Sequence, residues 1–97
     1  MSSYRYGILG AGRQGTAAAY DLVVRGEAAS VTLADIDPEA ARRAAERVNR
    51  LTGTERASGV RLDVTDAAAL VEFLRPLDAF IAAVSYKLNM RIAEAAL

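Results

Sequence analysis

The stretch Gly10-Ala11-Gly12-Arg13-Gln14-Gly15 decides the fold class of this chain. It follows the apolar-rich run Tyr4–Leu9, which predicts a buried strand, and it opens the proline-free segment Arg13–Arg25, which has the length of a helix. Gly26 stands where a left-handed C-cap is expected. A glycine-rich turn between a strand and a helix is typical of the first unit of a nucleotide-binding α/β domain.

The residues of this turn suit a bound pyrophosphate. Gly10 permits the sharp turn, Gly12 leaves the backbone open to a phosphate, and Gly15 lets the helix pack closely on the strand. The unpaired N–H groups and the partial positive charge of a helix N-terminus favour an anion there. We therefore predict a cofactor-binding role for Gly10, Gly12, Arg13, Gln14 and Gly15. Arg13 either pairs with a phosphate or is a solvated surface arginine.

The rest of the chain alternates predicted strands and helices. Apolar runs predict strands at Val31–Ala34, Val60–Val64 and Ala79–Val84. Helices are expected from the cap Asp37 to Gly53, from Ala67 to Leu74 after a cap at Thr65, and over Leu88–Leu97. The alternation predicts a Rossmann-type, doubly wound parallel sheet of about four strands in the order 3-2-1-4. Since the last helix stops without a cap, we interpret residues 1–97 as one dinucleotide-binding domain, the N-terminal part of a longer enzyme.

Asp35 lies 20 residues after Gly15, at the carboxyl end of the second predicted strand. A carboxylate at this spacing accepts hydrogen bonds from the adenosine ribose hydroxyls in dinucleotide-binding folds. Asp37 is interpreted mainly as the helix cap, with contact to the ribose as the alternative. Asp35 is thus the predicted ribose acceptor.

The ends of the third and fourth predicted strands supply the remaining candidates. Asp63 and Val64 lie where the adenine is expected, with Asp63 accepting from the amino group and Val64 packing on the ring; the alternative is that Asp63 and Thr65 only organise the helix start. Ala83 and Ser85 end the last strand at the switch point of the sheet, where the pyrophosphate and nicotinamide ribose should pass.

Composition excludes several kinds of chemistry. The chain has no histidine and no cysteine, so it cannot assemble a Ser-His-Asp triad, a thiol nucleophile or a zinc site of the usual ligands. We predict no catalytic and no metal-binding residues. Twelve basic and twelve acidic residues cancel, which disfavours nucleic acid as a partner. No apolar stretch approaches about 20 residues, and the lack of cysteine fits a reducing compartment, so we expect a cytoplasmic protein without a membrane partner.

The order of the motifs resembles one family of oxidoreductases. The runs that carry this resemblance are Tyr6–Gly15, Tyr20–Leu22, Leu33–Pro38, Leu62–Asp66 and Ile81–Ser85, with Asn89 and Ile92-Ala93 after them. Together they are similar to the N-terminal domain of saccharopine dehydrogenase-like and lysine 6-dehydrogenase-like enzymes. The resemblance implies hydride transfer at a carbon that bears nitrogen, a small amino acid as substrate, and a further domain that supplies the catalytic groups.

Two other interpretations stay open at this point. One is a nucleotide-sensing regulatory module like those attached to potassium transporters, and the other is an ornithine cyclodeaminase-like protein, which the Gly-Ala-Gly-Arg-Gln turn also fits. For the cofactor, Asp35 favours NAD over NADP, because its carboxylate repels a 2′-phosphate. Only Arg13, Arg42 and Arg43 lie near enough in sequence to counter that repulsion. The apolar strand Ala79–Val84 leaves an unpaired edge, which predicts a homodimer.

Overall fold

The structure, a computed structural model, describes residues 4–83, 94 and 96. Four strands, β1 (Tyr4–Leu9), β2 (Ala28–Asp35), β3 (Ala57–Arg61) and β4 (Ala79–Ala82), form one parallel sheet in the order β3-β2-β1-β4. The Rossmann-type α/β sheet predicted from the sequence is therefore confirmed, including its strand order. The register pairs Gly7 with Thr32 on one side and with Phe80 on the other.

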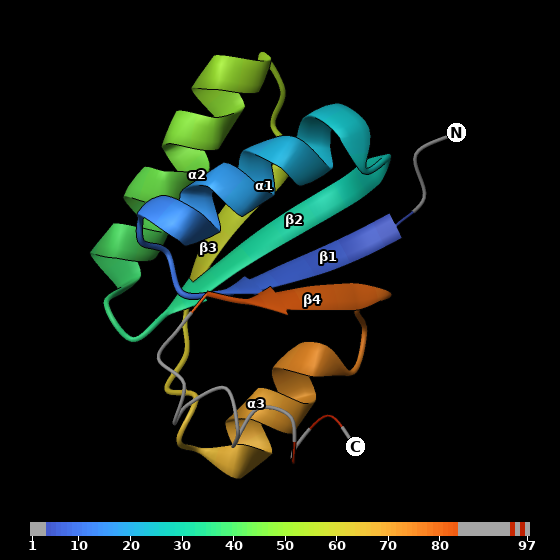
Figure 1. Cartoon of the computed structure of the whole chain (residues 1–97). Helices are drawn as coiled ribbons and strands as arrows, with labels where there is room; N and C mark the ends of the chain where they lie inside the picture. Colours follow the sequence, from blue (N-terminus) through green and yellow to red (C-terminus); the bar gives the residue numbers. More distant parts are fainter. Residues whose placement is uncertain (1–3, 84–93, 95, 97) are drawn as a thin grey trace.

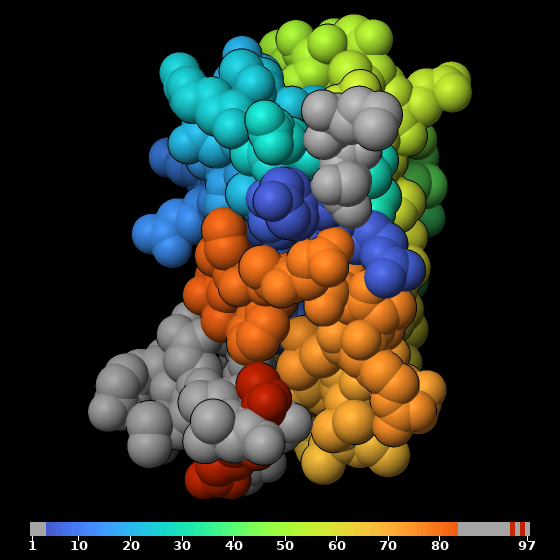
Figure 2. Space-filling view, turned by 90° about the vertical axis from the view of Figure 1, so that its right-hand side faces the viewer, coloured from blue at the N-terminus to red at the C-terminus, as the bar shows by residue number. Residues whose placement is uncertain are grey.

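Helices cover both faces of this sheet. Figure 1 shows α1 (Arg13–Arg25) and α2 (Pro38–Thr52) on one face and α3 (Ala67–Leu74) on the other. A buried cluster lies under α1 and α2, and a smaller one lies under α3. Their large side chains are Ile8, Val31, Leu33 and Val48 in the first cluster and Leu9, Leu62 and Leu70 in the second. Figure 2 views the end of the sheet where the strands begin, with the connection from α3 into β4 in orange.

The third strand lies earlier in the chain than the apolar pattern predicts. We expected Val60–Val64, but β3 runs over Ala57–Arg61. The side-chain amide of Asn49 accepts from the N–H of Ala57 and donates to its carbonyl, both at 2.9 Å, which fixes the start of the strand. Gly59 then lies against the backbone of Ala41, where a Cβ would overlap the carbonyl oxygen. Contacts with α2 therefore set this strand, not its own apolar content.

Two other strands also differ in their bounds. β2 begins at Ala28 instead of Val31, because Ala28 is buried and pairs with Tyr4 of β1. β4 ends at Ala82. The expected continuation to Val84 and the expected helix Leu88–Leu97 lie outside the described residues, apart from positions 83, 94 and 96.

Two predicted caps are corrected and two are confirmed. Gly26 has φ −92° and so is not left-handed; a Cβ there would lie 2.8 Å from the carbonyl oxygen of Leu22. Asp66, not Thr65, caps α3, because its carboxylate accepts from the N–H of Ala69 at 3.1 Å. Asp37 caps α2 as predicted, and Gly53 ends it with φ 67°.

Candidate functional site

The candidate site lies at the carboxyl ends of the strands, on both sides of the turn from β1 into α1. Because β1 lies between β2 and β4, the chain leaves β1 where the strand order reverses. Ligands of open α/β sheets bind in the crevice that such a reversal creates. The sequence-predicted residues of the glycine turn, the end of β2 and the segment after β3 all gather at this edge.

The backbone of the glycine turn is fixed by close contacts. Gly10 has φ 103°, a conformation that favours glycine, and its N–H donates to the carbonyl of Ala34 at 2.7 Å. A Cβ on Gly15 would overlap the carbonyl oxygen of Gly10 and lie 3.0 Å from its carbonyl carbon. Gly12 differs, since a Cβ built there meets nothing within 4 Å. Gly10 and Gly15 thus shape the turn, while Gly12 borders open space.

This open space faces backbone donors. Gly12 precedes the first residue of α1, and its carbonyl accepts from the N–H and the hydroxyl of Thr16 at 2.9 and 2.8 Å. Among the described residues, the N–H groups of Gly12, Arg13, Gln14 and Gly15 find no acceptor. A helix start leaves such donors unpaired, and they attract an anion. The turn therefore fits a phosphate, with the donors in place and no side chain in the way.

Asp35 lies beside the glycine turn, at the end of β2. One carboxylate oxygen accepts from the N–H of Ala11 at 2.9 Å, and the other accepts from the N–H of Asp37 at 3.0 Å. The side chain is half-buried. Asp35 therefore lies at the end of β2, where the sequence predicted it, and it also bonds to the turn, which sequence reasoning missed.

A slot of about 210 Å³ opens next to Asp35. Its walls come from the turn, the end of β2 and the segment after β3: Gly10, Ala34, Asp35, Ile36, Leu62, Asp63, Val64 and Thr65. The N–H of Leu62 donates to the carbonyl of Asp35 at 2.9 Å, which holds the two walls together. The slot is mostly apolar with carboxylates at its rim, so it suits a planar ring that carries polar edges.

Asp63 at the rim is hydrogen-bonded to Thr65. The hydroxyl of Thr65 donates to the carboxylate at 2.6 Å and its N–H donates at 3.0 Å, and both bonds lower the pKa of Asp63 below its ordinary value. Asp63 therefore organises the loop before α3, as the alternative interpretation expected. Asp63 is half-buried, and its carboxylate keeps acceptor capacity toward the slot.

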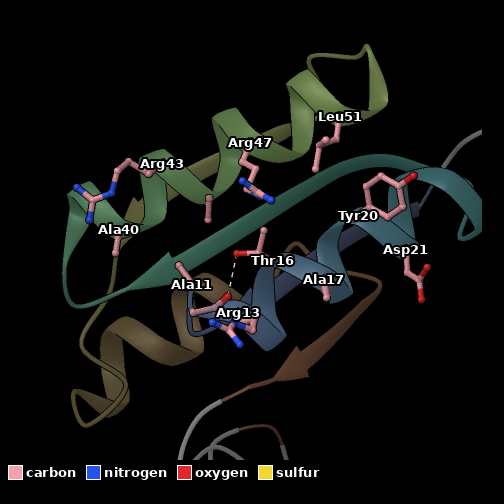
Figure 3. A pocket seen from close by; sticks show the side chains of 12 residues that line it. Ala11, Arg13, Thr16, Ala17, Tyr20, Asp21, Ala40, Arg43, Arg47 and Leu51 are labelled. Carbon is pink, nitrogen blue, oxygen red and sulfur yellow. Dashed lines mark hydrogen bonds between the residues drawn. The ribbon is translucent and has the colours of Figure 1, made fainter.

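A larger groove of about 830 Å³ runs between α1 and α2 and begins at Ala11 and Gly12 of the turn. Figure 3 shows its walls, with Thr16, Ala17 and Tyr20 on α1 and Arg43 and Arg47 on α2. This groove was not predicted from the sequence. The alanines on the facing sides of both helices, which leave space between them, could have indicated it. Arg43 and Arg47 of α2 line the same groove as Ala11 and Gly12 of the turn.

The three arginines considered for a 2′-phosphate differ in their partners. Arg42 bonds to Glu39 at 2.6 Å and to Glu46 at 2.7 Å, and both carboxylates raise the pKa of Arg42. Arg13 and Arg43 line the groove and form no ion pair within residues 4–83. Two of the three are therefore available to an anion.

The remaining predicted site residues follow β4. Ala83 donates its N–H to the carbonyl of Leu9 at 2.8 Å, which places it beside the end of β1 and hence near the turn. Ser85 lies outside the described residues. Within the described part of the chain, no cluster of histidine, cysteine or acidic residues is arranged to hold a metal, and no helix is long and apolar enough to cross a membrane.

Comparison with known proteins identifies the family of this chain. Residues 6–97 match the family described as the saccharopine dehydrogenase NADP binding domain. This confirms the resemblance inferred from the order of the motifs.

Solved structures repeat the fold. Saccharopine dehydrogenase (L-Glu forming) from Saccharomyces cerevisiae, in its apo form, superimposes with a TM-score of 0.77 at 22% identity, covering 97% of this chain and 19% of that one. Quinate dehydrogenase from Corynebacterium glutamicum in complex with NAD gives 0.72 at 28% identity, covering 84% and 27%. UDP-glucose-4-epimerase from Stenotrophomonas maltophila, with bound NAD and formylated UDP-arabinopyranose, gives 0.77 at 18%, covering 96% and 33%. The chain therefore spans a third or less of each of these proteins.

Proposed function

From its place in the saccharopine dehydrogenase NADP-binding domain family, to which this chain belongs, we propose that the chain holds the nicotinamide dinucleotide of an amino-acid oxidoreductase. The reaction of the full-length enzyme is hydride transfer between the nicotinamide and a carbon that bears nitrogen. This chain positions the cofactor, and a further domain binds the small amino-acid substrate and moves the proton.

The glycine turn carries this proposal. Its free N–H groups lie at the start of α1, where about half a unit of positive charge favours the pyrophosphate. Gly12 faces open space, so a phosphate oxygen can approach the backbone within hydrogen-bonding distance. The donors are part of the backbone, so they are oriented before the cofactor arrives.

The other groups of the dinucleotide find matching surroundings around the turn. The adenine occupies the slot between Asp35 and Val64, and the adenosine ribose donates its hydroxyls to Asp35. The pyrophosphate follows the turn from Gly12 to Gly15, with Arg13 and Gln14 beside it. The nicotinamide ribose passes Ala83 and Ser85. Gly10 and Asp63 also line the slot, and Asp63 accepts from the adenine amino group at its rim.

We further propose that the cofactor is NAD rather than NADP. At about 4 Å and an effective dielectric constant near 20, two unit charges repel by about 4 kcal/mol, and a 2′-phosphate carries nearly two charges. The total for two charges is about 8 kcal/mol, and a quarter of it, about 2 kcal/mol, exceeds a tenfold preference. Arg42 is already paired with two glutamates, so only Arg13 and Arg43 remain to offset it.

Titration with NAD, followed by backbone amide shifts, tests the proposal. The shifts of Gly10–Gly15 and Asp35 should move first, and NADP should require a higher concentration to produce the same change. Gly12→Ala is the matched control, because its Cβ fits the free fold and occupies the space of the phosphate. A spectrum that does not change at millimolar NAD would contradict dinucleotide binding. Turnover of an amino acid by this chain alone would contradict the division of labour between domains.

A further inference from the structure

Asp35 connects two segments that are far apart in the sequence. Its Oδ2 accepts from the N–H of Ala11 in the glycine turn at 2.9 Å, and its Oδ1 accepts from the N–H of Asp37 at 3.0 Å. Next to it, the N–H of Gly10 donates to the carbonyl of Ala34 at 2.7 Å. The side chain of Asp35 thus links β2 to the glycine turn, just after the last backbone pair of β1 and β2, Leu9 and Ala34.

The N–H of Ala11 depends on this carboxylate. Ala11 is a buried residue, its hydrogen bond to Asp35 is part-buried, and Asp35 is the acceptor that the structure gives its N–H. Leaving a buried N–H without an acceptor disfavours that conformation by about ten- to hundredfold in its equilibrium constant. The turn therefore loses a defined anchor when Asp35 moves or is replaced.

The carboxylate has capacity for both this bond and a ligand. It offers about four acceptor positions, and two are taken by the N–H groups of Ala11 and Asp37. Two remain, which matches the two hydroxyls of a ribose. An asparagine or serine at this position has fewer acceptor positions and cannot serve all four donors.

We propose that Asp35 is a positioning residue for the pyrophosphate cradle in addition to its role as the ribose acceptor. It holds Ala11, and through Ala11 the donors of Gly12 and Arg13, in the orientation that meets a phosphate. This inference rests on the proposed function and deepens it. Two consequences follow: loss of Asp35 weakens ligands that contain no ribose, and Asp35 cannot turn away from a 2′-phosphate without releasing the turn.

Inorganic pyrophosphate distinguishes this role from simple ribose recognition, because the two roles predict effects of opposite sign. If Asp35 only accepted from ribose, Asp35→Ala would remove a negative charge near the anion and leave pyrophosphate binding unchanged or tighter. If Asp35 positions the turn, the same substitution weakens pyrophosphate severalfold or more despite the lost repulsion. Asp37→Asn is the control for charge: it removes one nearby negative charge but keeps an effective helix cap.

The experiment measures pyrophosphate affinity by amide shifts of Gly12–Gly15 and, without ligand, the hydrogen exchange of the Ala11 amide. We expect weaker pyrophosphate and at least about tenfold faster exchange in Asp35→Ala, with Asp37→Asn like the wild type. Asp35→Asn, which keeps one acceptor oxygen, should fall between the two and serves if Asp35→Ala does not fold.

Each outcome bears on a separate part of the inference. Unchanged Ala11 exchange, or pyrophosphate binding that is equal or tighter in the Asp35 variants, would overturn the positioning role. If the wild type binds neither NAD nor pyrophosphate, the proposed function fails, while the exchange of Ala11 still decides whether Asp35 holds the turn.

Discussion

The same substitution at two glycines three residues apart should have opposite consequences. At Gly15, an added Cβ would overlap the carbonyl oxygen of Gly10 and lie 3.2 Å from Cγ2 of Ile8. At Gly12, an added Cβ meets nothing within 4 Å, and φ is −76°, which alanine adopts without strain. Gly15→Ala should therefore damage the fold, whereas Gly12→Ala should damage only binding.

The magnitudes come from competing effects at each position. At Gly15, alanine gains about 1 kcal/mol from helix propensity, but overpacking against backbone atoms costs about 3 kcal/mol, near the upper end of its range. The expected net loss is about 2 kcal/mol, or about 10 °C in Tm for a domain of this size. At Gly12, alanine is the poorer N-cap by up to about 1 kcal/mol, and the lower entropy of the unfolded chain offsets about as much. Its stability should hardly change.

Urea unfolding of both variants and the wild type measures these differences in stability. Titration of the wild type and Gly12→Ala with NAD then measures the difference in affinity. Gly12→Ala should keep the wild-type midpoint and lose about tenfold or more in NAD affinity, since its Cβ occupies the path of the pyrophosphate. Equal destabilisation by both substitutions, or wild-type stability of Gly15→Ala, would refute the steric reasoning. Wild-type NAD affinity in Gly12→Ala would refute the placement of the phosphate.

Three further outcomes are expected. Asp35→Ser should lower NAD affinity by about tenfold or more and NADP affinity by less, as measured by calorimetry; a wild type that prefers NADP, or a ratio that the substitution leaves unchanged, would show that Asp35 does not read the ribose. Thr65→Val should destabilise the protein at neutral pH, and because the folded-state pKa of Asp63 is lowered, the difference should vanish as the pH falls through that pKa, below 3.8. Thermal melts at about pH 6 and about pH 2 compare the two proteins, and a Tm difference that is larger at the lower pH would contradict the prediction. The outer edge of β4, which has no strand beside it among the described residues, should support a dimer in light scattering; a monomer at high micromolar concentration would contradict this.

The elements that the sequence predicted well are those set by local signals. Tyr4–Leu9, Arg13–Arg25 and Ala67–Leu74 have the bounds expected from their apolar runs and flanking residues. Asp37 caps α2 as predicted, because a carboxylate directly before a proline and a helical pattern commonly serves as the N-cap. The strand order follows from short connections and right-handed crossovers, which leave few alternatives.

The features that escaped prediction depend on contacts distant in sequence. The position of β3 follows from the Asn49 amide and from the approach of Ala41 to Gly59, and neither leaves a periodic pattern in the chain. Asp66 was passed over as the cap of α3 for its neighbour Thr65, which bonds to Asp63 instead. The contact between Asp35 and Ala11 spans 24 positions, so the sequence indicated Asp35 as a site residue without joining it to the turn.

The missed contact changes the argument on cofactor choice. From sequence alone, Asp35 could turn away and let Arg13 reach a 2′-phosphate, which would weaken the preference for NAD. In the structure, that rotation would leave the part-buried N–H of Ala11 without its acceptor, an unfavourable change of about 1 kcal/mol or more. Arg42 would also have to leave Glu39 and Glu46 before it could help. The loss of the Ala11 bond adds to the repulsion at Asp35, so the proposed preference for NAD rests on both, and Arg13 and Arg43, which form no ion pair among the described residues, are the cations that could offset it.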